Sequence, residues 1–124
     1  MLGTHEATAT IAVKDLDAAR KFYEGTLGLT PGGDENGEAL SYKTGRSTLL
    51  VYRSQFAGTN KATAATWSVG DVDAAVKDLK ARGIEFERYD MPDVKHEGDV
   101  HVFGPMRVAW FKDPDGNIHS LVND

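Results

Sequence analysis

The sequence predicts an α+β fold built from two β-α-β-β-β modules. The first indication is an internal repeat, because residues 9–21 and 65–77 match at eight of thirteen positions with a constant offset of 56. The second is that a helical pattern follows each copy of the repeat and strand patterns follow each helix. A repeat of this kind indicates two structural units of the same fold. We expect one domain over residues 1–124, with the modules at about 6–54 and 62–123.

The first module begins with alternating β-compatible residues at Thr8–Val13, which predict a strand. Asp15 is placed to cap a helix, and apolar residues then recur at helical spacing until Gly28, which is expected to end it. Ala39–Lys43 and Ser47–Arg53 predict two further strands joined by a hairpin turn.

The second module repeats this order. Asp71 is expected to cap its helix and Gly83 to end it. A tight turn is expected at residues 113–117, where the sequence reads Asp-Pro-Asp-Gly-Asn. The expected strands are Ala64–Val69, Glu85–Tyr89, Arg107–Phe111 and Ile118–Val122.

The segment Asp90–Pro105 is rich in Pro and Gly and has no clear periodicity. A loop of this length is either a mobile surface excursion or a lid over a ligand, and the sequence leaves both open. His96 and His101 lie in it, and they are either exposed or near a ligand.

Composition excludes several classes of protein. The chain has no cysteine, which rules out disulfides and thiolate metal sites. Its net charge is −5 with no basic stripe, which argues against nucleic-acid binding. No apolar run is long enough to span a membrane, and no signal peptide is visible. We therefore expect a cytoplasmic protein with no nucleic-acid or membrane partner.

Three motifs together carry a family resemblance. They are Val13-x-Asp15-Leu16-x-x-Ala19-x-x-Phe22-Tyr23-x-x-x-Leu27-Gly28-Leu29, Val69-x-Asp71-Val72-Asp73-Ala74-Ala75 and Phe111-x-Asp113-Pro114-Asp115-Gly116-Asn117. This combination resembles the vicinal oxygen chelate superfamily, the group of glyoxalases, bleomycin-resistance proteins and dioxygenases. The resemblance implies that the two modules form an eight-stranded cup with helices on its outer face, and that the protein is a homodimer.

The resemblance also implies four metal-ligand positions on the floor of the cup. Metal-dependent members carry His or Gln on the first strand and Glu on the last strand of each module. The residues at the matching positions are Thr8, Leu50, Ala64 and Ser120. Alanine and leucine have no donor atom, and neutral hydroxyls are poor ligands without carboxylate or imidazole partners. We therefore expect no metal, no cofactor and no catalytic residue.

Strand alternation predicts a neutral ligand-binding face instead. His119 is expected on the opposite face, hydrogen-bonded among the helices. Arg107 and Trp110 lie on opposite faces of one strand, and alternation does not decide which of them enters the cup. The expected ligand-binding residues are Thr8, Thr10, Tyr42, Leu50, Tyr52, Ala64, Thr66 and Ser120.

The leading functional hypothesis is metal-independent binding of a small organic molecule, as in the bleomycin-resistance proteins of the group. One alternative is a metal-dependent lyase, isomerase or dioxygenase that uses non-standard ligands. A structural or regulatory dimer with an unused cup is a third. The sequence leaves the identity of the ligand open, and it does not decide whether the cup forms within one chain or between two.

Overall fold

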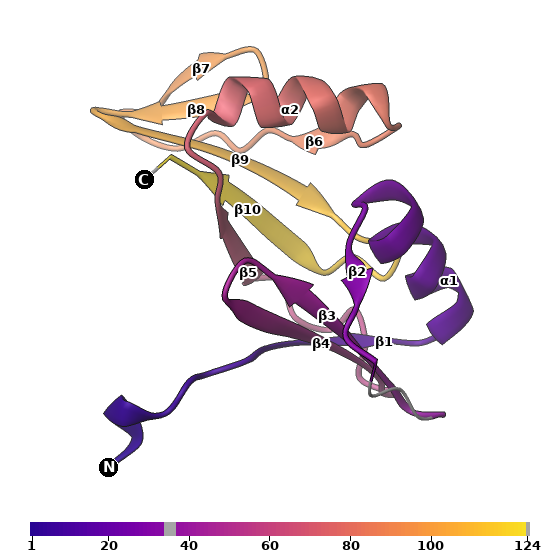
Figure 1. Cartoon of the computed structure of the whole chain (residues 1–124). Helices are drawn as coiled ribbons and strands as arrows, with labels where there is room; N and C mark the ends of the chain where they lie inside the picture. Colours follow the sequence, from indigo (N-terminus) through magenta and orange to yellow (C-terminus); the bar gives the residue numbers. More distant parts are fainter. Residues whose placement is uncertain (34–36, 124) are drawn as a thin grey trace.

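The structure, a computed structural model, describes residues 1–33 and 37–123 and contains two sheets with helices packed on them (Figure 1). The four-stranded sheet has the order β1-β4-β3-β2, and the second sheet has the order β5-β10-β9-β8-β7 with β6 beside β9. The elements are η1 (Leu2–Thr4), β1 (Ala9–Val13), α1 (Leu16–Arg20), η2 (Lys21–Thr26), β2 (Thr30–Pro31), β3 (Ala39–Thr44), β4 (Ser47–Arg53), β5 (Thr63–Ser68), α2 (Val72–Ala81), β6 (Phe86–Glu87), β7 (Lys95–Glu97), β8 (Val100–Phe103), β9 (Met106–Lys112) and β10 (Ile118–Val122).

The expected modules are present. The first runs β1-α1-β2-β3-β4, with β1 parallel to β4 and the other pairs antiparallel. The second runs β5-α2-β8-β9-β10 in the same arrangement, with β5 parallel to β10. The strand expected at Glu85–Tyr89 is present as the short β6 beside β9. Strands β7 and β8 lie in the segment Asp90–Pro105, so the second sheet has six strands rather than the four expected for an eight-stranded cup.

Helix ends lie where the local chemistry places them. The Asp15 carboxylate accepts a hydrogen bond from the backbone N–H of Asp17 at 2.8 Å, and Asp71 accepts one from Ala74 at 3.0 Å. These bonds satisfy N–H groups that have no partner inside the helix. Helix α1 continues into the wider π-helical turn η2, which ends before Gly28 at φ +73°. Glycine adopts this left-handed backbone without a steric penalty.

The segment Asp90–Pro105 is more regular than the sequence indicated. Strands β7 and β8 form a hairpin in which His96 pairs with His101. The expectation of a long structureless loop is therefore wrong. The hairpin forms because β8 pairs with β9, which supplies hydrogen-bond partners that are remote in sequence.

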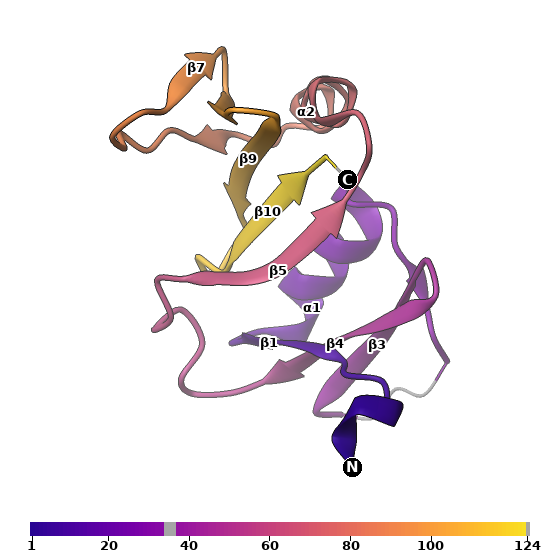
Figure 2. The ribbon, with the colours of Figure 1, turned by 90° about the vertical axis from the view of Figure 1, so that its left-hand side faces the viewer.

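The helices cover one face of each sheet. Helix α1 lies on the right of Figure 1, and the view from the left in Figure 2 shows β5 and β10 in front of it. Two apolar clusters lie on the helix side, one centred on each module. Phe22, Leu27 and Trp67 pack against both clusters, so the α1–η2 segment joins the two cores. We call the opposite side of each sheet its open face.

A chain of buried hydrogen bonds crosses between the modules. The Trp67 indole N–H donates to Nδ1 of His119 at 3.0 Å, and Nε2 of His119 lies 3.0 Å from the Tyr23 hydroxyl. The Tyr23 hydroxyl donates to Asp113 at 2.6 Å. His119 therefore donates from Nε2 to Tyr23, which uses every donor once. The expectation that His119 faces the helices as a hydrogen-bonded structural residue is confirmed.

The turn after β9 ties the second module to the end of β1. Asp113 accepts hydrogen bonds from the backbone N–H groups of Asp115 and Asn117, as expected for a tight turn. The Asn117 amide also donates to the carbonyl of Ala12 at 2.8 Å, and the Lys14 N–H donates to Asp115 at 3.3 Å. The Asp-Pro-Asp-Gly-Asn motif therefore joins the modules as well as reversing the chain.

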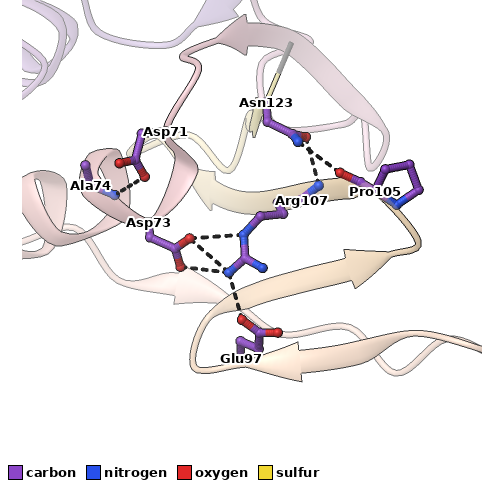
Figure 3. Close-up of polar contacts among 7 residues, drawn as sticks. All are labelled: Asp71, Asp73, Ala74, Glu97, Pro105, Arg107 and Asn123. Carbon is purple, nitrogen blue, oxygen red and sulfur yellow. Dashed lines mark hydrogen bonds and ion pairs between the residues drawn. The ribbon is translucent and has the colours of Figure 1, made fainter.

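Arg107 connects helix α2 to the β7–β8 hairpin (Figure 3). Its guanidinium donates twice to Asp73, at 2.9 and 3.0 Å, and once to Glu97 at 2.9 Å. Its backbone N–H donates to the side chain of Asn123 at 2.8 Å. Arg107 therefore lies on the helix side of β9, which places Trp110 on the open face.

Among the described residues, no helix combines the length and the apolar character that crossing a membrane requires.

Candidate functional site

The open face of the first sheet carries three of the expected ligand-binding residues. Thr10 pairs with Leu50 across β1 and β4, and Tyr52 is one alternation further along β4. Thr10 is exposed, Leu50 is half-buried and 39% of Tyr52 is exposed. Thr8 precedes β1 and is also exposed. This face is neutral and uncovered at these positions.

The open face of the second sheet carries the other predicted hydroxyls. Thr66 pairs with Ser120, and their hydroxyl oxygens are 2.7 Å apart. Ala64 alternates with the buried Ala65 and also touches the first core cluster. Ser120 pairs on its other side with Trp110, so the indole shares this face. Of the two candidates on β9, Trp110 therefore lies on the open face and Arg107 on the helix side.

Tyr42 is on the wrong face for the expected site. It pairs with Leu49 rather than Leu50, and its side chain is completely buried on the helix side. Its ring stacks on Tyr23 with the ring centroids 6.1 Å apart, and its hydroxyl donates to Glu24 at 2.8 Å. The expectation that Tyr42 lines the cup is therefore wrong. A strand shifted by one residue presents the other set of side chains, and sequence alone did not settle this register.

The four positions that resemble metal-ligand positions do not form a metal site. They offer only the hydroxyls of Thr8 and Ser120, and the Ser120 hydroxyl is already hydrogen-bonded to Thr66. Over the described residues, no group of three or more His, Cys, Asp or Glu side chains is arranged to hold a metal ion. The donor set at these positions does not fit a divalent cation.

An open cleft of about 600 Å³ lies on the open face of the second sheet. None of the eight expected residues lines it, although Trp110 lies directly beside Ser120. The residues Gly58–Thr63 that lead into β5 and the segment after β6 form its walls. The side chains that determine its chemistry are Trp110, Tyr89, Met91, Ile118, Lys61 and Lys112.

Tyr89 forms an edge-to-face pair with Trp110, with ring centroids 5.3 Å apart. Two histidines hold the Tyr89 backbone. Its N–H donates to Nε2 of His101 at 2.9 Å, and its carbonyl lies 3.0 Å from Nε2 of His96. The His101 ring also meets the Trp110 ring edge to face at 4.7 Å.

His101 is completely buried, so the possibility that it is a surface residue is excluded. Burial and, to a lesser extent, the neighbouring His96 lower the pKa of His101, which keeps its ring neutral and able to accept the Tyr89 N–H. His96 and His101 therefore shape the cleft by holding the backbone of Tyr89 in place. The sequence offered no sign of this, because residues 89, 96, 101 and 110 meet only after β7, β8 and β9 have paired.

Residues 6–120 match the model of the Glyoxalase/Bleomycin resistance protein/Dioxygenase superfamily, and the chain belongs to this superfamily. The resemblance expected from the sequence is confirmed, and so is the α+β fold of paired modules. None of the curated proteins matches the chain at a significant level.

Solved structures share the fold at low sequence identity. A glyoxalase family protein from Enterococcus faecalis is 21% identical with a TM-score of 0.75, and covers 99% of this chain and 100% of its own. A lactoylglutathione lyase from Agrobacterium tumefaciens is 20% identical with a TM-score of 0.73, covering 97% and 93%. A bleomycin-binding protein complexed with bleomycin is 18% identical with a TM-score of 0.73, covering 97% and 98%. At these identities the similarity shows the fold alone.

Proposed function

We propose that this protein binds a small organic molecule in the cleft around Trp110, without a metal or a cofactor. The observation that carries the proposal is the combination of a half-buried indole, an edge-on tyrosine and the apolar Met91 and Ile118 around one concave space. Small-molecule sites are typically concave and mostly apolar, with aromatic side chains and a few polar groups that orient the ligand. Trp110 is placed to stack on a planar group.

The residues at the ligand positions of the superfamily support a metal-free site. Thr8, Leu50, Ala64 and Ser120 lack the imidazoles and carboxylates that a divalent metal needs. One solved relative of the fold is a protein in complex with bleomycin, a further reason to prefer binding over metal-dependent lyase, isomerase or dioxygenase chemistry. In this proposal the exposed Thr66 offers a hydroxyl near the cleft, and the buried Ser120 holds it through their mutual hydrogen bond.

We further propose that the protein is a homodimer in the cytoplasm. The open face of the first sheet presents Thr10, Leu50 and Tyr52 with nothing from the described chain packed over them as a layer. A neutral, partly apolar face of this kind suits the centre of an interface between copies. In this arrangement the two open faces that one chain carries would be completed by a second copy.

The absence of cysteine supports the cytoplasmic location, because a chain without disulfides needs no oxidising compartment.

The test uses an aromatic probe and two changes in the cleft. We expect 8-anilino-1-naphthalenesulfonate to bind the metal-stripped protein. We expect this binding to be lost in the Trp110→Ala variant. Met91→Trp is also expected to abolish probe binding, because the indole would fill the cleft. Residue 91 lies in a loop, where the fold tolerates a larger side chain. The matched control is Phe56→Ala, which removes an exposed aromatic side chain outside the cleft.

Fluorescence titration measures binding, and elemental analysis measures metal content. Probe binding that survives both cleft variants would contradict the proposed site. About one tightly held transition metal per chain, with probe binding lost on its removal, would favour the metal-dependent alternative.

A further inference from the structure

Every polar side chain that lines the Trp110 cleft can donate a hydrogen bond. Lys61 and Lys112 line it, and none of the described lining residues is acidic. This contrasts with the chain as a whole, which has a net charge of −5. A cleft whose charge opposes that of the protein concentrates ligands of the complementary sign.

The two lysines differ in how far they are neutralised. The Lys112 ammonium forms an ion pair with Glu87 at 3.4 Å. Lys61 is exposed, and it has no ion-pair partner within the described part of the chain. Lys61 is therefore the cation of the cleft that is available to a ligand, and Lys112 is partly compensated.

Two neutral groups add to the donor character. The Asn60 side-chain oxygen accepts the backbone N–H of Ala62 at 3.0 Å, so the amide hydrogens of Asn60 remain to donate. The buried Tyr89 hydroxyl has no hydrogen-bond partner among the described groups. Burial, reinforced by Glu87, raises the pKa of the Tyr89 phenol, so this hydroxyl keeps its proton at neutral pH. Because the Tyr89 oxygen is enclosed, Lys61 and Asn60 are the donors that a ligand in the cleft meets directly.

We propose that the natural ligand is a planar aromatic compound carrying an anionic group, with the ring stacked on Trp110 and the anion directed to Lys61 and Asn60. This inference rests on the proposed function, and it adds the class of ligand. An aromatic carboxylate is the simplest compound that meets these requirements. Its ring supplies the stacking surface, and its two oxygens accept charge-assisted hydrogen bonds.

The experiment compares three probes of the same shape that differ in charge: 1-naphthoate, 1-naphthamide and 1-naphthylmethylammonium. Isothermal titration calorimetry measures each dissociation constant, because its signal does not depend on the presence of Trp110. We expect the acid to bind about tenfold more tightly than the amide at low ionic strength, because hydrogen bonds to charged groups are stronger than neutral ones. We expect the cation to bind most weakly, and the preference for the acid to shrink as salt is added.

Three variants assign the preference to the cleft. Lys61→Gln should reduce the acid-to-amide ratio to about threefold or less and leave amide binding unchanged. Lys77→Gln, which removes the same charge from an exposed position on α2, should leave the ratio as it is. Glu87→Gln should raise the ratio, because it releases Lys112 from its ion pair.

The outcomes separate this inference from the function on which it rests. Equal binding of the three probes, lost on Trp110→Ala, would overturn the anionic class and leave small-molecule binding standing. A preference for the acid that Lys61→Gln does not change would also overturn the inference. Failure of every probe to bind would overturn the inference together with the proposed function.

Discussion

His119 is enclosed by side chains from both modules, and its protonation state depends on that enclosure. Its two ring nitrogens are hydrogen-bonded to Trp67 and Tyr23, and the Phe111 ring stacks on the imidazole with ring centroids 4.9 Å apart. Burial lowers the pKa of His119 to about 4, and the nearby Asp113 offsets this only in part. The folded protein therefore holds His119 neutral under conditions in which the unfolded chain binds a proton.

This state predicts a dependence of stability on pH. A histidine whose pKa is lowered by folding contributes fully above its ordinary pKa of 6.5, and that contribution falls as the pH drops towards 4. Across this window we expect a loss of about 3 kcal/mol in the free energy of unfolding from His119 alone. Urea unfolding at a series of pH values measures it.

The control is His119→Gln, which cannot titrate. Its unfolding free energy should fall less steeply than that of the wild type between pH 6.5 and 4. The slope that remains includes the buried His101, whose pKa is also lowered. Equal slopes in the two proteins would contradict a neutral buried His119.

The segment between β4 and β5, residues 54–62, depends on close contact with the turn after β9. Gly58 has φ +80°, and a Cβ atom built on it would lie 2.7 Å from the carbonyl oxygen of Asp115. This turn also holds the end of β1 through Asn117. The segment 54–62 can reach β5 along this path only because residue 58 has no side chain.

Gly58→Ala is therefore expected to destabilise the fold by about 1–3 kcal/mol, since both the backbone conformation and the contact with Asp115 oppose a side chain. The matched control is Gly45→Ala in the β3–β4 turn, where φ is +58° and no atom lies within 4 Å of the new Cβ. We expect a cost of about 1 kcal/mol there. Chemical denaturation compares the two, and an equal cost would show that the contact with Asp115 relaxes easily.

The arrangement of the two modules bears on where the cup forms. The α1–η2 segment packs against both cores, so the helix sides of both sheets share one apolar interior. The Trp110 cleft lies on the open face of the second sheet alone, while Thr10 and Tyr52 remain exposed on the first. A second copy is the simplest means of bringing two open faces together.

We therefore expect a mass of twice 13.5 kDa in sedimentation equilibrium at micromolar concentration. Leu50→Glu places a charge on the open face of the first sheet and should shift the protein towards monomer, because an unpaired buried charge is costly. Ala81→Glu, at an exposed position of α2, should leave the dimer intact. A wild type of 13.5 kDa at every concentration would rule out the dimer.

Features that depend only on neighbouring residues could be predicted from the sequence. The caps at Asp15 and Asp71 and the stops at Gly28 and Gly83 are local, since each involves only the chemistry of one helix turn. The repeat indicated two equal modules, and the motif at residues 111–117 indicated the family and the turn. The residues of β10 on the open face were also predictable, because strand alternation places Ser120 and His119 on opposite faces.

Features that depend on strand register and on long-range pairing became visible in the folded protein. Tyr42 lies under the helix because it pairs with Leu49, and a shift of one residue would have placed it in the cup. Trp110 lies on the open face because it pairs with Ser120. The cleft combines Lys61, Tyr89 and Trp110 from three separate segments of the chain. Local periodicity cannot bring such residues together, because their contact arises only when the strands of the second sheet have paired.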